Sequence, residues 1–472
     1  MRKLDVTVGQ ANKPRIRRHG ILLGVTAASL GVVYGYDLSN IAGALLFITD
    51  EFGLTTRQQE LVTTAVVLGE IAGALGAGML ANLIGRRWSM VLVAAGYAVF
   101  ALLGAMSDSV PMLLAARLLL GLTIGVSVVV VPVFVAESAP ASVRGALLVG
   151  YQVATVLGII VGYLACYLLA DSRDWRAMLA LAAVPATLVA LLLVRMPDTA
   201  RWYLLKGRVA EARRALQHVE PDSAVERELA EINAALREES GGRFVEMLRR
   251  PYLRATVFVI ALGFFIQITG VNAIVYYSPR LFDAMGFRGN FALLVLPATV
   301  QAAALAAVLV SVVLVDRLGR RPVLLSGIGA MIAADAVLIV VFAAHSAAVF
   351  GFIGVLLFTM GFTFGFGALV WVYAGESFPS RLRSMGSSAM LTANLLANAI
   401  VAGLFLTMLH SLGGAGTFAV FGVFAVGGFA FVYRFAPETN GRQLEEIRHF
   451  WENGGRWPDE LPSATTDVTP CR

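Results

Sequence analysis

Charged residues are scarce in this sequence, and cysteine is scarcer still. Asp, Glu, Lys and Arg make up 14% of the 472 residues, whereas soluble domains contain about 25%. The two cysteines are Cys166, inside an apolar stretch, and Cys471, near the C-terminus. The deficit of charge indicates a membrane protein, and the position of the cysteines predicts no disulfide.

Patterns for catalysis and cofactor binding are also missing. The sequence has no spaced cluster of metal ligands, no Ser-His-Asp set, no phosphate-binding glycine loop and no channel filter motif. Its 47 glycines lie mostly in apolar stretches, where small residues let helices pack closely. We therefore expect a protein that is not an enzyme and that uses no metal and no cofactor.

Long apolar runs dominate what is present, with 58% hydrophobic residues and a mean hydropathy of +0.76. About 20 helical residues suffice to cross a bilayer, and each run reaches that length. The runs predict an all-α membrane protein with twelve transmembrane helices in two sets of six. They cover approximately residues 20–55, 58–81, 88–106, 110–137, 145–170, 176–195, 254–284, 291–315, 322–344, 348–377, 385–409 and 417–436.

The polar segments divide the chain and orient it. Basic residues fall in the N-terminal tail and in alternate loops, while the other loops carry acids such as Asp50 and Glu51. This asymmetry predicts a multi-pass protein of the plasma (inner) membrane with both termini cytoplasmic, and it explains the net charge of +6 without a nucleic-acid partner. The expected segments are a tail at 1–19, a six-helix repeat at 20–195, an intracellular helical linker at 196–250, a second repeat at 251–436 and a tail at 437–472.

Short motifs recur in the two sets of runs. A Gly-Arg-Arg triplet follows the second and eighth runs, a Glu-Ser pair with a later Arg closes the fourth and tenth, and a Pro-acid-Thr triplet ends the sixth and twelfth. Such order indicates an internal duplication, and two parallel repeats around a midplane cavity are typical of a transporter. The paired motifs are residues 85–87 and 319–321, 137–144 and 376–383, and 197–199 and 437–439.

These motifs, over nearly the whole chain, resemble the sugar porter family of the major facilitator superfamily. The resemblance implies the major facilitator fold, a single working chain, and alternating-access transport of a small neutral sugar such as a hexose, a pentose or a related polyol. The matching stretches are residues 35–43, 85–87, 132–145, 267–277, 316–321 and 437–441.

Asp37 is an ionisable residue deep in the first apolar run. Helical rise places it about 28 Å from Arg18, and it places Arg117 about 30 Å from Glu137, so the two share a depth and we expect them to pair. Proton symporters of the family carry Asp here, whereas facilitators carry Asn. The resemblance therefore implies that Asp37 binds the transported proton and Arg117 modulates it. The alternative is a permanent ion pair that only holds helices together.

Amide side chains on different helices reach similar depths, and each offers the donor and acceptor that a neutral polyol needs. An aromatic ring in the tenth run can stack on a sugar ring. The family uses these positions for hydroxyl contacts and stacking. For Asn82, Thr392 and Asn398 we expect only helix-to-helix hydrogen bonds. The predicted sugar site comprises Gln152, Gln267, Asn272, Trp371 and Asn394.

Two predicted gates complete the interpretation. Tyr276 and Tyr277 are expected to close over the sugar from outside, with interfacial anchoring as the alternative. Charged residues at the cytoplasmic side are expected to join the two repeats when the inside is shut, although positive-inside topology accounts for part of this pattern. This cytoplasmic network comprises Arg86, Arg87, Glu137, Arg144, Arg320, Arg321, Glu376 and Arg383.

Several features leave the function open. Ile266, Leu395 and a tenth run without its two usual prolines depart from the family, so the sugar is not specified, and a uniporter or a carrier of another small solute remains an alternative. Glu70 and Asp335 lie inside apolar runs. Glu70 could be a second proton site or a partner for Arg117, and Asp335 is assigned no role.

Overall fold

The computed structural model describes residues 18–139, 144–217, 222–239, 244–344 and 347–457, and every regular element among them is helical. The predicted all-α fold is confirmed. The first half of the chain forms α1 (Arg18–Ala28), α2 (Leu30–Phe52), α3 (Thr56–Ile84), α4 (Arg86–Ala105), α5 (Val110–Ser138), α6 (Arg144–Leu169), α7 (Trp175–Leu181) and α8 (Ala183–Val194).

The second half repeats this arrangement. It forms α13 (Leu253–Ile268), α14 (Val271–Ala284), the π-helix η1 (Phe291–Val295), α15 (Leu296–Leu318), α16 (Arg320–Ala343), α17 (Ala348–Phe362), the π-helix η2 (Thr363–Gly367), α18 (Ala368–Glu376), α19 (Ser380–Ser411) and α20 (Gly413–Phe435). The described residues contain twelve helical stretches that are long and apolar enough to cross a membrane, as the sequence predicts.

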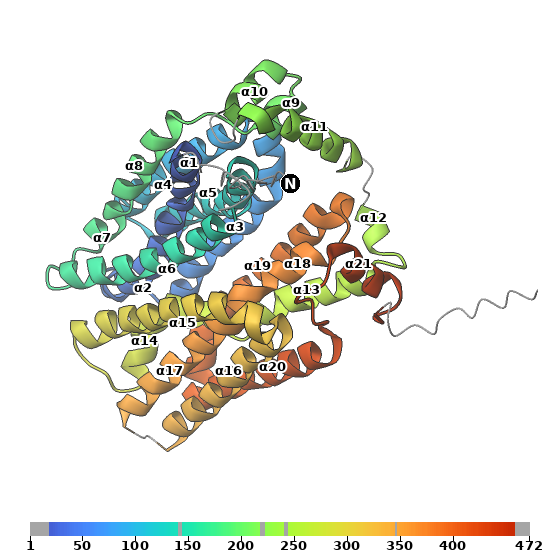
Figure 1. Ribbon diagram of the computed structural model, residues 1–472. Coiled ribbons are helices and arrows are strands. Elements are labelled where there is room, and N and C mark those ends of the chain that lie inside the picture. Colours follow the sequence, from blue (N-terminus) through green and yellow to red (C-terminus); the bar gives the residue numbers. More distant parts are fainter. Residues whose placement is uncertain (1–17, 140–143, 218–221, 240–243, 345–346, 458–472) are drawn as a thin grey trace, which may run out of the picture.

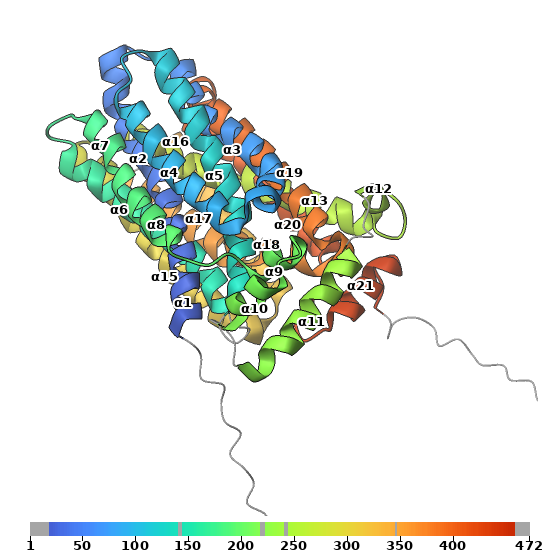
Figure 2. The same cartoon turned by 90° about the horizontal axis from the view of Figure 1, so that it is seen from above.

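The two halves form separate bundles that lie side by side, as Figure 1 shows. Between them in the chain lie α9 (Ala200–Leu205), α10 (Val209–Gln217), α11 (Asp222–Glu239) and α12 (Phe244–Met247), and α21 (Leu444–Glu452) follows the last long helix. Both views place these short helices toward the same end of the molecule (Figures 1 and 2). We call this the insert end, and the opposite end, where α2 ends and α3 begins, the far end.

The seventh and tenth spans are interrupted near their middles. Gly270 separates α13 from α14 with φ 97°, and Tyr277 has a non-helical φ of −122° just before Pro279. In the tenth span the α-helix is interrupted by the π-helix η2, a feature that often accompanies a change in helix direction. Ser311 donates its hydroxyl to the carbonyl oxygen of Phe364 in this segment, at 2.7 Å.

The halves touch where α3 packs on α19, α2 on α14, and α6 on η1 and α15. The polar contacts that cross these pairs lie toward the far end. Tyr163 on α6 donates to the carbonyl oxygen of Val275 on α14, and Asn290 donates to Asp171 at 3.0 Å. The two bundles are thus joined by packing and hydrogen bonds at the far end.

Candidate functional site

Asp37 and Arg117 form an ion pair in the N-terminal bundle. The Arg117 Nη1 donates to Asp37 Oδ1 at 2.6 Å, and the two residues are 3% and 2% exposed. A single charge at this depth would cost at least about 2.5–3.5 kcal/mol, so pairing is required for either to remain ionised. The prediction that Arg117 is the partner of Asp37 is confirmed.

The pair borders a small pocket within the same bundle. Asn40, one turn along α2, lines it, and the Oδ1 of Asn40 has no hydrogen-bond partner among the described residues. Tyr97 on α4 is buried within electrostatic reach of Asp37. The pocket is otherwise lined by apolar residues such as Phe100 and Leu120, so the polar groups available to a water molecule there are those of Asp37, Asn40 and Arg117.

The amides of the C-terminal bundle form two hydrogen-bonded groups. Gln267 Nε2 donates to Asn394 Oδ1 at 3.3 Å, which links α13 to α19. Asn272 Nδ2 donates to Asn398 Oδ1 at 3.1 Å, and Asn398 Nδ2 donates to the Tyr276 hydroxyl at 3.3 Å. Asn398 does bond helix to helix as predicted, but it also joins a predicted sugar ligand to a predicted gate residue.

One of these amides keeps a free acceptor. The Oε1 of Gln267 is buried without a hydrogen-bond partner in the described part of the chain. A buried acceptor of this kind is costly unless a ligand or water satisfies it. Gln267 can therefore accept a hydrogen bond from a bound hydroxyl without first breaking its bond to Asn394.

The other two predicted sugar ligands stand apart from these groups. Gln152 is half-buried on α6, and Trp371 on α18 is 44% exposed directly after the π-helical bend. Among the residues that the structure describes, neither forms a hydrogen bond to the amides of α13, α14 and α19. A ring with this exposure is available for stacking.

Tyr276 and Tyr277 are both held within the C-terminal bundle. The Tyr276 hydroxyl accepts from Asn398, while the Tyr277 hydroxyl donates to the Ala402 carbonyl at 2.7 Å and its ring stacks on Phe405. Both side chains are almost fully buried, at 3% and 0% exposure. The two tyrosines therefore fix α14 against α19.

A polar clip that the sequence did not reveal joins the halves at the far end. The carboxylate of Glu60 on α3 is fully buried and accepts from the backbone N–H and the hydroxyl of Thr407 on α19, at 2.7 and 2.9 Å. Arg57 pairs with Glu60 at 3.3 Å and donates to the Gly403 carbonyl at 2.8 Å. An acid in the first turns of a helix is common, so the sequence carried no signal for this contact.

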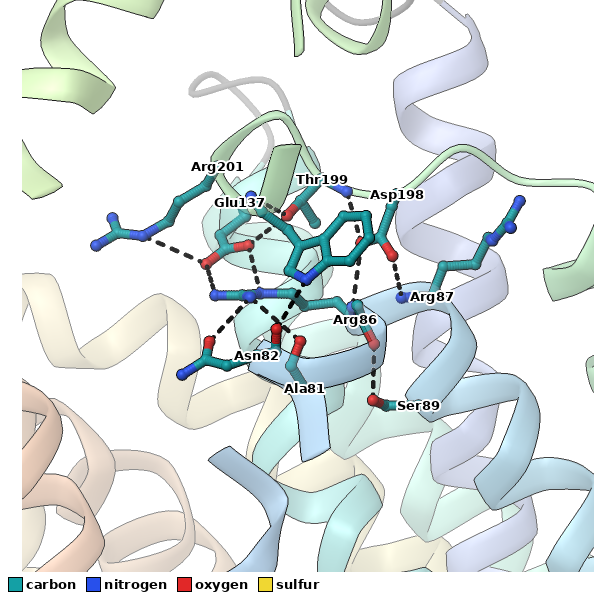
Figure 3. A network of polar contacts seen from close by, with 11 residues as sticks. Ala81, Asn82, Arg86, Arg87, Ser89, Glu137, Asp198, Thr199 and Arg201 are labelled. Atoms are coloured by element: carbon teal, nitrogen blue, oxygen red, sulfur yellow. Dashed lines mark hydrogen bonds and ion pairs between the residues drawn. The ribbon is translucent and has the colours of Figure 1, made fainter. Parts of the chain in front are cut away.

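At the insert end, Glu137 is the centre of a network in the N-terminal half, shown in Figure 3. Arg86 binds it with two N–H groups, at 3.1 and 3.2 Å, in the bidentate geometry that favours arginine. Thr199 donates its hydroxyl to Glu137 at 2.6 Å, and Arg201 lies 3.6 Å away. The network ties α4 and α5 to the start of the insert.

Asp198 caps α4 within the same network. It accepts from the backbone N–H groups of Arg86 and Arg87, at 3.1 and 3.3 Å, where a helix favours a negative charge. Burial raises the pKa of the Asp198 carboxyl, although these N–H groups oppose the shift. Gly85 is required beside it, since its φ is 98° and a Cβ there would lie 2.0 Å from Asp198 Oδ2.

The C-terminal half repeats this chemistry. Arg320 Nη1 donates to Glu376 at 2.6 Å and to the Thr439 hydroxyl at 2.8 Å. Glu438 caps α16 by accepting from the backbone N–H groups of Arg320 and Arg321, both at 3.0 Å. Asp198, Thr199, Glu438 and Thr439 were not among the predicted site residues, although the repeated Pro-acid-Thr triplets were the signal that marked them.

The predicted cytoplasmic network therefore exists as two networks, one in each half. Arg87 and Arg321 bind backbone carbonyls of their own halves, those of Met196 and Tyr433, rather than the glutamates. Arg383 lies within electrostatic reach of Glu376, and the side chain of Arg144 lies outside the described residues. Sequence order fixes which charges share an end, but it does not fix which of them meet.

Comparison with known proteins decides the class of this chain. The family model described as "Sugar (and other) transporter" matches residues 23–451. The chain belongs to the sugar transporter family. It is a multi-pass membrane transporter and not an enzyme, as the sequence predicts.

Relatives in this family include proton symporters. The chain is 34% identical to the arabinose-proton symporter of Escherichia coli K12 over 439 residues, which cover 91% of this chain and 93% of the relative. It is 34% identical to the galactose-proton symporter of the same strain, over 89% and 92% of the two chains. It is also 30% identical to polyol transporter 5 of Arabidopsis thaliana, over 95% and 89%.

Solved structures confirm the predicted major facilitator fold. The proton:xylose symporter XylE bound to 6-bromo-6-deoxy-D-glucose matches with a TM-score of 0.79 and 24% identity, over 92% of this chain and 99% of the other. A partially occluded inward-open conformation of XylE from E. coli matches with a TM-score of 0.80 and 23% identity, over 90% and 99%.

Proposed function

We propose that this transporter carries a small neutral sugar together with a proton, by alternating access. The observation that supports the proposal most is the enclosed Asp37–Arg117 pair at 2.6 Å, which places a titratable acid between two membrane surfaces. A proton on Asp37 removes the attraction of Arg117 and alters the packing of α2 against α5. Relatives named as arabinose-proton and galactose-proton symporters support the same chemistry.

We infer that the sugar binds between the halves, in contact with Gln152, Gln267, Asn272, Trp371 and Asn394. The free Oε1 of Gln267 would accept a hydroxyl hydrogen, and Trp371 offers an exposed ring for the apolar face of the sugar. The buried Ile266 and Leu395 offer no amide to a ligand. The sugar hydroxyls that this chain hydrogen-bonds would therefore differ from those bound by relatives with polar residues at these positions. A hexose, a pentose or a related polyol fits this chemistry.

We place the insert end and both termini in the cytoplasm and the chain in the plasma (inner) membrane, because the basic loops lie at that end. In this orientation the bundles are joined at the extracellular end, and the state corresponds to an inward-facing carrier. Tyr276 and Tyr277 are then proposed as part of the extracellular gate, because they lie on α14, which packs against α2 of the other half. We expect one chain to suffice, because both bundles come from it.

Uptake into proteoliposomes tests the proposal. Purified protein should accumulate one of glucose, galactose, arabinose, xylose or inositol when the outside is acidic, and Asp37→Asn should abolish accumulation while it leaves sugar-sugar exchange in place. Asp108→Asn, at a side chain with 91% exposure, is the matched control and should behave as wild type. Wild-type uptake that does not depend on the pH gradient would instead identify a uniporter. If none of the five sugars is taken up, the substrate is another small solute.

A further inference from the structure

Glu70 is a buried carboxyl group that the proposed cycle does not use. It lies on α3 with no exposed surface, and both carboxyl oxygens have no hydrogen-bond partner among the described residues. A carboxylate left ionised and alone at this depth would be very costly. In the conformation described here, Glu70 is therefore protonated.

The surroundings of Glu70 join both halves of the transporter. It is within electrostatic range of Asp37 on α2 and Arg117 on α5. Three buried tyrosines are also within electrostatic range of it: Tyr34 on α2, Tyr151 on α6 and Tyr276 on α14. Three further helices pack on α3: α19, α4 and α2. The ionisable residues of α19 lie near its two ends: Arg381, Arg383 and His410. On α4, Tyr97 is within electrostatic range of Asp37 and Arg117.

Close helix packing places Glu70 at the contact between α3 and α5. A Cβ on Gly69 would lie 2.1 Å from the Leu118 carbonyl, and one on Gly125 would lie 2.1 Å from the carbonyl of Glu70 itself. The backbones of α3 and α5 are thus in direct contact on either side of Glu70. Arg117 is carried by the same helix α5, which keeps its guanidinium within electrostatic range of Glu70.

Arg117 keeps an unused donor for a second carboxylate. Its Nη1 binds Asp37, but its Nε is buried with no hydrogen-bond partner in the described residues. Two carboxyl groups and one guanidinium are neutral together only when one carboxyl carries a proton. The site therefore has two arrangements of equal charge, with the proton on Glu70 or on Asp37.

We propose that Glu70 is a second proton-binding residue that exchanges Arg117 with Asp37 during transport. In the exchange, the O–H bond of Glu70 breaks and one forms at Asp37, through water or by direct contact. Arg117 leaves the newly neutral Asp37 and pairs with the new Glu70 carboxylate, so charge is conserved. This inference rests on the proposed proton-coupled function, because it names where the proton stays when Asp37 is ionised.

The arrangement also links the proton to the predicted sugar ligands. Tyr276 is within electrostatic range of Glu70 and accepts a hydrogen bond from Asn398, which in turn holds Asn272. A sugar that binds Asn272 would change the bonds of Asn398 and Tyr276. Of the charged groups that interact with Tyr276, Glu70 has the largest effect, so a change at Tyr276 would alter the proton affinity of Glu70 first.

Transport by Glu70→Gln tests the proposal, with Asp335→Asn as the matched control. Asp335 is equally buried and also has no partner in the described residues, but it lies on α16 against Gly422, away from this site. In proteoliposomes, the external proton concentration that gives half-maximal sugar uptake should be about tenfold higher for Glu70→Gln than for wild type. The reason is that protonating Asp37 in this variant leaves Arg117 without an anion. Sugar-sugar exchange should persist, Glu70→Asp should restore part of the pH profile, and Asp335→Asn should match wild type.

A stability cycle tests the exchange of Arg117 without any transport. In Asp37→Asn, the guanidinium can still pair with Glu70, so the melting temperature in detergent should fall little. Asp37→Asn combined with Glu70→Gln leaves Arg117 with no anion, and its melting temperature should fall by more than the sum of the single shifts. Asp37→Asn combined with Asp335→Asn should be additive.

An unchanged pH profile in Glu70→Gln, or additive melting shifts in the double variant, would overturn the proposal. Failure of the proposed function gives a different result, since the wild type itself would then show no uptake driven by a pH gradient.

Discussion

Asp37, Glu70 and Asp335 are buried carboxyl groups well inside the membrane-spanning helices, and their neighbours assign them different roles. Asp37 is paired with Arg117, Glu70 is within electrostatic range of that pair, and Asp335 lies next to Gly422. Counting helical rise along the sequence brought Asp37 and Arg117 to one depth, and the two do meet. The same count could not separate Glu70 from Asp335, because depth does not specify which face of a helix a residue occupies.

Arg117→Leu tests the energy of the buried pair. Removing the guanidinium leaves Asp37 enclosed without its cation, so the protein should lose about 3–5 kcal/mol of stability. Asp37→Asn combined with Arg117→Leu should recover part of the loss, since no buried charge is then left alone. The measurement is thermal melting of detergent-solubilised protein.

The matched control is Arg227→Leu, at an exposed pair whose side chains are 74% and 63% accessible. Such pairs contribute at most about 1 kcal/mol, so this variant should melt close to wild type. An Arg117→Leu protein as stable as this control would mean that the buried pair contributes no net stability.

Among the helices, α3 and α19 hold the two bundles together at the far end. Glu60 accepts two hydrogen bonds from Thr407, and Arg57 reaches the Gly403 carbonyl. These bonds cross from one bundle to the other, so they must break before the far end opens. Breaking them costs free energy that favours the state described here.

Glu60→Gln should therefore shift the carrier toward the state with an open far end. A charge-assisted bond contributes about 1.5–3 kcal/mol, so the open population should rise about tenfold. Thr64→Cys reports this opening, because Thr64 lies against Gly403 in the same contact. With Cys471→Ser as background, maleimide should label Thr64→Cys faster when Glu60→Gln is present.

Asp108→Asn provides the matched comparison, since it removes an exposed charge near the same end. Equal labelling rates with Glu60→Gln and with Asp108→Asn would show that the Glu60 bonds do not hold the end closed.

The sequence predicted the positions of the membrane-spanning helices well, but not the contacts between their side chains. Apolar length located all twelve spans, whereas the π-helix η2 in the tenth span was not predicted. The tie from Asn398 to Asn272 and Tyr276 could not be predicted, because it depends on how α14 is rotated after the break at Gly270. The sequence also could not predict that the arginines at the insert end pair within their own half, because this depends on how the helices pack in three dimensions.

At the scale of the whole molecule, orientation in the bilayer is the property that the charge pattern predicts most directly. Asp108→Cys, at the far end, should react with an impermeant maleimide added to intact cells. Arg208→Cys, beside the insert at 48% side-chain exposure, should react only after the cells are opened. Cys471→Ser is again the background, because Cys166 is fully buried. The reverse pattern of labelling would place the termini outside the cytoplasm.

The two networks at the insert end have a mechanical consequence for the molecule. Each bundle completes its own arginine-glutamate pair and its own capped helix, in the first half through Glu137 and Asp198 and in the second through Glu376 and Glu438. Neither bundle depends on the other for these bonds, so each can tilt as a rigid body without internal strain. The free-energy difference between the two orientations of the carrier is therefore set at the far end, where the bonds of Glu60 and Arg57 join the bundles, and by the ligand that binds between them.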